Sequence, residues 1–110
     1  MSSSARKHDV FQAVSDPTRR KLMKLLADQE LPIADISRHF PISRTAVTKH
    51  LRVLSEAQLV SGRKVGREKL YRLHPEPLNE LQRWLSYFDQ YWDNKLSMLK
   101  HKVEIRDKEK

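Results

Sequence analysis

The chain has 110 residues, no cysteine and a formal net charge of +8. This length accommodates one domain with a modest core, because a domain of ~100 residues leaves about a third of its unfolded-chain surface in water. The absence of cysteine excludes disulfides and thiolate metal sites. No apolar run approaches the ~18 residues of a membrane span, and residues 1–8 lack the apolar stretch of a signal peptide. We therefore expect a cytoplasmic protein with no membrane partner.

The positive charge is concentrated in the middle third of the chain. Residues 38–72 hold nine Lys or Arg against two Glu, a net charge of +7, whereas residues 1–37 carry +1 and residues 73–110 are neutral. A solvated surface usually mixes both signs, as the other two segments do. The excess predicts a polyanionic partner for residues 38–72.

The first 40 residues predict three helices. The first is a short apolar patch at about residues 7–14. The second begins at Asp16 and Pro17, because Asp is a favoured N-cap and Pro is favoured at the first helical position. Apolar residues spaced 3 and 4 apart indicate a short third helix; they are Ile33, Ile36 and Phe40.

A fourth helix and a hairpin are predicted in the basic third. The helix covers about residues 44–57, and Ser43 is suited to cap it after the tight connection at residues 41–43. Its apolar stripe is Ala46, Val47, Leu51 and Leu54. Polar and basic side chains are left facing outward or obliquely: Arg44, Thr45, Thr48, Lys49 and Arg52. Residues 59–64 and 69–73 then predict two strands that turn at Gly66.

The rest of the chain predicts one long helix over about residues 75–105. Apolar residues recur there at steps of 3 and 4 from Leu78 to Val103, which is nearly a heptad stripe. A helix of about 28 residues is ~42 Å long at ~1.5 Å per residue, longer than so small a domain is wide. Part of the stripe therefore requires a second chain, and we expect a homodimer. Its aromatic residues could alternatively line an effector pocket, but their spacing is that of a helix seam.

The order of these elements is more specific than any one of them. Two short helices joined by a tight turn, the second basic on its outer face, are typical of a helix-turn-helix, and a basic hairpin directly after them is typical of a wing. A helix fits the major groove of DNA, ~12 Å wide, and the hairpin offers cations, Arg63 among them, to the backbone or minor groove. We therefore expect double-stranded DNA as partner. The candidate contact residues are Ser43, Arg44, Thr45, Thr48, Lys49, Arg52, Lys64, Arg67 and Lys69.

Several stretches resemble the ArsR/SmtB family of bacterial regulators. Residues 11–20, FQAVSDPTRR, resemble its opening signature, and residues 42–54, ISRTAVTKHLRVL, resemble its recognition helix. Residues 57–60, AQLV, and the Gly-Arg and Leu-Tyr pairs within residues 66–73 resemble the exit from that helix and the wing. The likeness extends over about residues 8–100.

The resemblance implies a mainly α fold with a small β-hairpin, a winged helix-turn-helix of order α-α-α-α-β-β-α in a single domain over residues 1–110. Residues 8–73 would be the DNA-binding core with its wing, and residues 75–105 the dimerisation helix. The family implies a repressor that binds an imperfect inverted repeat as a dimer built from its first and last helices. The dimer residues expected on this basis are Val10, Phe11, Leu81, Trp84, Leu85, Phe88 and Trp92.

The chain departs from the metal-sensing members of that family. They carry Glu-Leu-Cys-x-Cys at the start of the third helix, where this chain has Pro32 and Ala34 in place of the cysteines. A second family site pairs Asp-x-His with His-x-x-Glu; His101 and Glu104 are present, but Tyr91 stands two residues after Asp89. We therefore expect no metal site and no cofactor, and the sequence identifies no effector ligand.

Other function classes find less support. No nucleophile-base arrangement, Gly-rich phosphate loop or paired metal ligands can be placed, which argues against an enzyme. A protein-interaction adaptor or antitoxin-like subunit that binds another protein through the long last helix is the main alternative. An RNA-binding winged helix would need exposed stacking aromatics in the basic third, where only Phe40 and Tyr71 occur.

Overall fold

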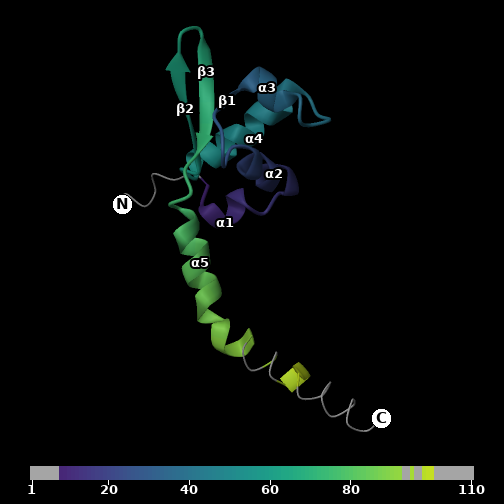
Figure 1. The fold of residues 1–110 in the computed structure, drawn as a ribbon, viewed down its shortest axis with the longest axis vertical. Helices are drawn as coiled ribbons and strands as arrows, with labels where there is room; N and C mark the ends of the chain where they lie inside the picture. Colours follow the sequence, from purple (N-terminus) through teal and green to yellow (C-terminus); the bar gives the residue numbers. More distant parts are fainter. Residues whose placement is uncertain (1–7, 93–94, 96–97, 101–110) are drawn as a thin grey trace. The chain divides into compact units, whose positions relative to one another are not determined.

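The computed structural model describes residues 8–92, 95 and 98–100, and it divides into two compact units that meet between Glu80 and Leu81 (Figure 1). The first unit contains seven elements within the described residues. These are α1 (Val10–Ala13), α2 (Pro17–Leu25), β1 (Leu31–Pro32), α3 (Ile33–Ser37), α4 (Arg44–Glu56), β2 (Val60–Val65) and β3 (Glu68–Leu73). The helix α5 (Leu78–Tyr87) begins in the first unit and continues in the second.

Side-chain caps begin three of the helices. The Asp9 carboxylate accepts a hydrogen bond from the Gln12 amide at 2.8 Å, and the Gln12 side-chain oxygen accepts one from the Asp9 amide at 3.2 Å, a capping box that starts α1. Asp16 accepts from the Arg19 amide at 3.0 Å and starts α2, with Pro17 at the first position. Ser43 accepts from the Ala46 amide at 3.1 Å and starts α4. The caps expected at positions 16 and 43 are confirmed.

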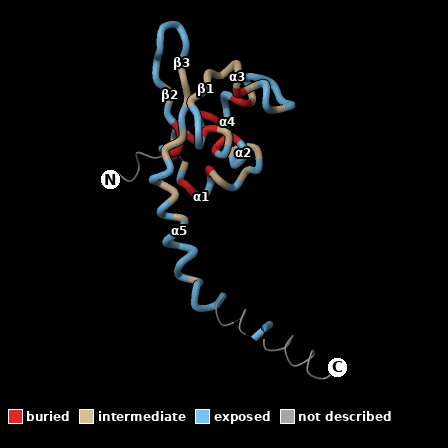
Figure 2. Tube along the Cα trace, in the orientation of Figure 1, coloured by how far each residue is buried: buried red, intermediate tan, exposed pale blue. Residues whose placement is uncertain are grey.

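The core of the first unit lies between its four helices and the start of the hairpin, as the buried segments in Figure 2 show. The predicted apolar stripe of α4 is confirmed at Val47, Leu51 and Leu54, which are buried, while Ala46 is half-buried. Large residues from each neighbouring element complete the core: Val10, Leu22, Leu26, Ile36, Leu59 and Val60. Burial of one face of α4 leaves its other face to solvent.

The hairpin carries a third strand that the sequence did not predict. The sheet order is β1-β3-β2, all antiparallel, with Leu31 opposite Tyr71 and Pro32 opposite Leu70. Strand β1 ends in Pro, a residue that sheets accept at their edges. It is only two residues long, so the sequence shows no alternating pattern that would predict it. The predicted hairpin itself is confirmed: Val65 faces Glu68, and Gly66 turns the chain with a φ of +64°.

The carboxyl end of α4 closes with a Schellman motif. The Leu59 amide donates a hydrogen bond to the Leu54 carbonyl, and the Gln58 amide donates one to the Ser55 carbonyl, both at 2.9 Å. The residue between the helix and β2 that adopts the left-handed conformation is Gln58, with a φ of +63°. Glycine is the usual residue there, because a side chain in this conformation costs roughly 1 kcal/mol.

The last helix differs from its expected bounds. It begins at Leu78 rather than near residue 75, because residues 76–77 form a turn. Regular α-helix stops after Tyr87. The Phe88 amide donates a hydrogen bond to the Leu85 carbonyl, and the Tyr91 amide donates one to the Phe88 carbonyl, both at the tighter three-residue spacing. Residues 89–92 are helical again. The predicted extension over residues 101–105 lies outside the described residues, and among the described helices none combines the length and apolar character needed to cross a membrane.

The Gln58 conformation yields a stability prediction. Gln58→Gly should stabilise the protein by about 1 kcal/mol, because glycine adopts positive φ without steric cost. For a domain of this size that raises the melting temperature by roughly 4–8 °C, measured calorimetrically at one fixed protein concentration. Gln58→Ala is the matched control, because it removes the side chain but keeps the strain. Equal melting temperatures for the two variants would contradict the prediction.

Candidate nucleic-acid interface

The outer face of α4 presents the side chains that the sequence singled out. Arg44, Thr45, Thr48, Lys49 and Arg52 are all exposed, and Ser43 caps the helix before them. The helix α3 packs against α4, and residues 38–43 connect the two. A short helix followed by a tight connection and a helix with a polar outer face is the helix-turn-helix arrangement.

A hydrogen-bond network around Arg19 holds α4 against the first two helices. The Arg19 guanidinium donates to the carbonyls of Ala13 at 2.8 Å and Gln12 at 3.1 Å, and lies 3.3 Å from Nδ1 of His50 on α4. The same His50 nitrogen lies 3.9 Å from the Asp16 carboxylate. Burial raises the pKa of Asp16, but the hydrogen bond from the Arg19 amide and the charges of His50 and Arg19 outweigh burial and hold that pKa below its ordinary value.

Three polar residues of this region have partners within the fold. Arg20 likewise donates to a backbone carbonyl, that of Val14, at 2.7 Å. The guanidiniums of Arg19 and Arg20 therefore connect the end of α1 with the start of α2. His50 is half-buried beside Arg19, so it orients the recognition helix. Sequence spacing gave no signal for a pairing between positions 19 and 50.

The hairpin presents some of its cations to solvent and uses another internally. Lys64, Arg67 and Lys69 are exposed, as expected for a wing, and Figure 1 shows the hairpin extending beyond the helices of its unit. Arg63, which the sequence placed among the DNA-facing cations, instead donates two hydrogen bonds of 2.8 Å to the Glu30 carboxylate. The hydrogen bond from Arg63 lowers the pKa of Glu30, and the same contact raises the pKa of Arg63. The pair ties β2 to the residue before β1.

A groove separates the recognition helix from the wing. It encloses about 270 Å³ and is lined by Thr48, Leu51, Arg52 and Ser55 of α4 and by Lys69 and Tyr71 of β3. Three of these residues, Thr48, Arg52 and Lys69, were expected to contact DNA. Ser55 and Tyr71 were not expected to, because only the fold brings their elements together.

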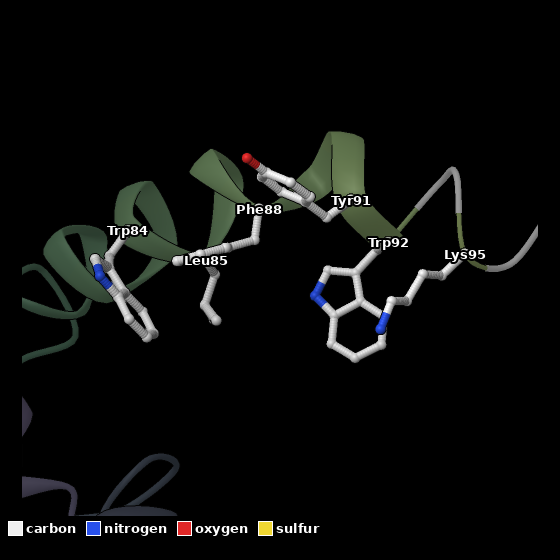
Figure 3. A pocket seen from close by; sticks show the side chains of 6 residues that line it. All are labelled: Trp84, Leu85, Phe88, Tyr91, Trp92 and Lys95. Atoms are coloured by element: carbon white, nitrogen blue, oxygen red, sulfur yellow. The ribbon is translucent and has the colours of Figure 1, made fainter.

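The second unit carries an apolar aromatic face of its own. A cavity of about 370 Å³ is lined by Trp84, Leu85, Phe88, Tyr91, Trp92 and Lys95, and Figure 3 shows Trp84, Leu85 and Trp92 pointing to one side of the helix. The rings of Trp84 and Phe88 meet edge to face with centroids 5.1 Å apart. Trp84 remains 52% exposed and Trp92 60% exposed. All of the lining residues come from one short stretch of the chain, so this is an uncovered face rather than an enclosed pocket.

The residues expected at a dimer interface are divided between core and surface. Val10 is completely buried, because α1 packs it against α4 within its own unit, so its side chain offers no surface to a partner. Phe11, Leu81 and Phe88 are half-buried. Trp84, Leu85 and Trp92 are exposed on the aromatic face.

The stretch that carries cysteines in metal-sensing relatives has another role here. Residues 30–34 supply the carboxylate that binds Arg63, then strand β1 and the first turn of α3. Within the part of the chain that the structure describes, no three His, Asp or Glu side chains gather in a way that could hold a metal ion. His101 and Glu104 lie outside the described residues.

Comparison with known proteins places this geometry in a family. Residues 16–61 match the family described as bacterial regulatory protein, arsR family. The transcriptional repressor SdpR of Bacillus subtilis is 36% identical over 89 residues, which cover 81% of this chain and 99% of that protein.

Solved structures agree in fold. An ArsR-like transcriptional regulator from Rhodococcus sp. RHA1 is 36% identical, with a TM-score of 0.70 and coverage of 86% of this chain and 87% of that one. The homodimeric winged helix-turn-helix DNA-binding domain of Mb0332 from Mycobacterium bovis is 23% identical, with a TM-score of 0.59 and coverage of 74% and 75%, and it supports the fold alone. The chain therefore belongs to the ArsR family and is a DNA-binding transcriptional regulator with a winged helix-turn-helix fold, not an enzyme.

Proposed function

We propose that this protein represses transcription as a homodimer that binds an imperfect inverted repeat in double-stranded DNA. The observation that carries the proposal is that the polar face of α4 and the basic hairpin flank one groove. A helix in the major groove, ~12 Å wide, would then place the hairpin at the neighbouring backbone or minor groove. That the B. subtilis relative is a transcriptional repressor supports repression as the outcome.

The contact residues divide into two roles. Side chains at the start of a recognition helix reach base edges, and we assign this role to Arg44, Thr45, Thr48 and Lys49. Cations farther along α4 and on the hairpin neutralise phosphates, which positions the protein without reading sequence; we assign this role to Arg52, Lys64, Arg67 and Lys69. Ser43 places the helix amides, whose dipoles favour a nearby phosphate.

The aromatic face of the second unit supports self-association. Exposed aromatic side chains that line one helix face mark a protein contact site, and residues 73–110 carry no net charge to oppose a second copy. The homodimeric domain from M. bovis shows that a protein of this fold can form a homodimer. Trp84, Leu85, Phe88 and Trp92, together with Leu81 and Phe11, are the interface residues we propose.

Selection from random duplex DNA tests the proposed function. A two-fold dimer places two recognition helices in successive major grooves, so the selected site should be a pseudo-palindrome. Its half-sites should be spaced by about 10 base pairs or a multiple. The measurement is sequencing of fragments retained by the purified protein. A non-symmetric consensus, or no enrichment, would contradict the proposal.

Two variants serve as controls for that selection. Arg44→Ala should relax the preference at one position of each half-site, with a lost base contact costing ~1–3 kcal/mol. Arg67→Ala should instead weaken all duplexes evenly and lower the salt slope by about 1 if it touches phosphate. Identical selected motifs for the wild type and Arg44→Ala would remove Arg44 from the reading residues.

Dimerisation through the aromatic face has its own test. Trp84→Glu combined with Phe88→Glu should yield monomers, because the two positions lie one turn apart on the same helix face. Tight operator binding should be lost with the dimer. Ser86→Glu is the matched control, since at 100° per residue position 86 points away from position 84. The measurement is sedimentation at micromolar protein concentration. A wild-type protein that sediments as a monomer would contradict dimerisation.

The Glu30 and Arg63 pair yields a prediction about specificity. Glu30→Gln should release Arg63, because it removes the carboxylate that accepts both guanidinium hydrogen bonds. The released Arg63 would then contact one more phosphate, so affinity for unrelated duplex DNA should rise and the salt slope should become steeper by about 0.9. The preference of the protein for its operator over unrelated DNA should fall as a result. Asp28→Asn adds the same unit of net charge without touching the pair. Equal effects of the two variants would show that only net charge matters.

A further inference from the structure

The polar side chains that line the groove between α4 and β3 are all cations or hydroxyls. Its lining offers two cations, Arg52 and Lys69, and three hydroxyls, those of Thr48, Ser55 and Tyr71, and no carboxylate. Glu68 adjoins Lys69 along β3, but successive strand residues face opposite sides of a sheet. The carboxylate of Glu56, next along α4, is engaged 3.2 Å from His8. The lining residues therefore favour an anion.

The residue spacing on α4 and on β3 places the lining side chains of each element on one face, toward the groove. Thr48, Arg52 and Ser55 are spaced 4 and 3 apart on α4, which puts them on one face of the helix above the buried Leu51. Lys69 and Tyr71 are two apart on β3, which puts them on one face of the sheet. The charged heads thus come from two elements that local sequence does not connect.

The absence of a side chain at Gly62 leaves space for the Lys69 side chain beside the groove. Gly62 lies opposite Tyr71 in the β2–β3 register, and a Cβ at position 62 would overlap the Lys69 Cε and lie 3.0 Å from its Cγ. The Lys69 Nζ lies 5.5 Å from the centre of the Tyr71 ring. Gly66 is the glycine with positive φ in the hairpin, so the backbone does not demand glycine at position 62. A glycine inside a strand marks the close approach of another group, and here that group is the Lys69 stem.

We propose that this groove holds one phosphate of the DNA backbone, bound jointly by Arg52 and Lys69 with hydroxyl donors from Ser55 and Tyr71. Arg supplies a planar fork of donors suited to phosphate, and Lys supplies a compact charge. Because one phosphate bridges both walls, its binding fixes the wing relative to the recognition helix. Thr48, one of the proposed base-reading residues, lines the same groove one turn before Arg52. The inference rests on the proposed function and adds a shared phosphate to it.

The experiment scans the selected operator with single methylphosphonate substitutions, each of which removes the charge of one phosphate. Wild type should lose about tenfold in affinity at one phosphate of each half-site, as expected for a charge-assisted contact. Arg52→Gln and Lys69→Gln should each be less sensitive than the wild type to substitution at that phosphate, because one of the two cations is lost, and the double variant should be insensitive. Gly62→Ala, whose Cβ displaces the Lys69 side chain, should lower the sensitivity as Lys69→Gln does. Lys64→Gln, a hairpin cation outside the groove, should keep the wild-type sensitivity.

Salt dependence separates a shared phosphate from two separate ones. If Arg52 and Lys69 hold the same phosphate, the double variant should lower the salt slope by about 0.9 in total, whereas separate phosphates would lower it by about twice that. Gly62→Ala retains every charge, and if it fails to fold the two glutamine variants still decide the matter.

Three outcomes would overturn the inference. One is a methylphosphonate profile that is the same in all variants, and a second is additive loss of salt slope in the double variant. The third is saturable binding of inorganic phosphate at Arg52 and Lys69, seen by NMR without DNA, combined with no sensitive position in the operator. Failure to select any operator would instead count against the proposed function itself.

Discussion

The burial of one face of α4 is the constraint on which the interface depends. Val47 and Leu54 are completely buried, and truncation of such a leucine typically costs ~2–5 kcal/mol. The helix therefore cannot rotate about its axis without exposing that stripe. The core therefore determines which residues of α4 face solvent, and the polar character of the outer face follows from the packing of the inner one.

Packing fixes the rotation of α4, and polar contacts fix its neighbours. Arg19 connects two carbonyls at the end of α1 with His50 on α4, and Glu30 holds Arg63 of the hairpin. Both contacts use a guanidinium that counts as positive charge in the sequence but has a structural partner in the fold. The number of cations available to a polyanion is therefore smaller than the composition indicates.

Local signals in the sequence predicted the elements well. Asp16, Ser43 and Gly66 each act within a few residues of their own position, as caps or as a turn, so spacing alone located the helix starts and the hairpin. The strand β1 was missed because its partner is Tyr71, forty residues away, and two residues carry no periodicity. The Arg63 contact and the residues Ser55 and Tyr71 of the groove were missed for the same reason: side chains from distant segments meet only after folding.

The distribution of charge along the chain reconciles two associations that would otherwise oppose each other. A net charge of +8 disfavours the approach of a second copy. Seven of those charges belong to residues 38–72, which form α4 and the hairpin, whereas residues 73–110 are neutral and carry the aromatic face. The proposed self-association would therefore bring together the neutral segments. The basic segments would remain free to bind the phosphate backbone, whose negative charge offsets the repulsion between them.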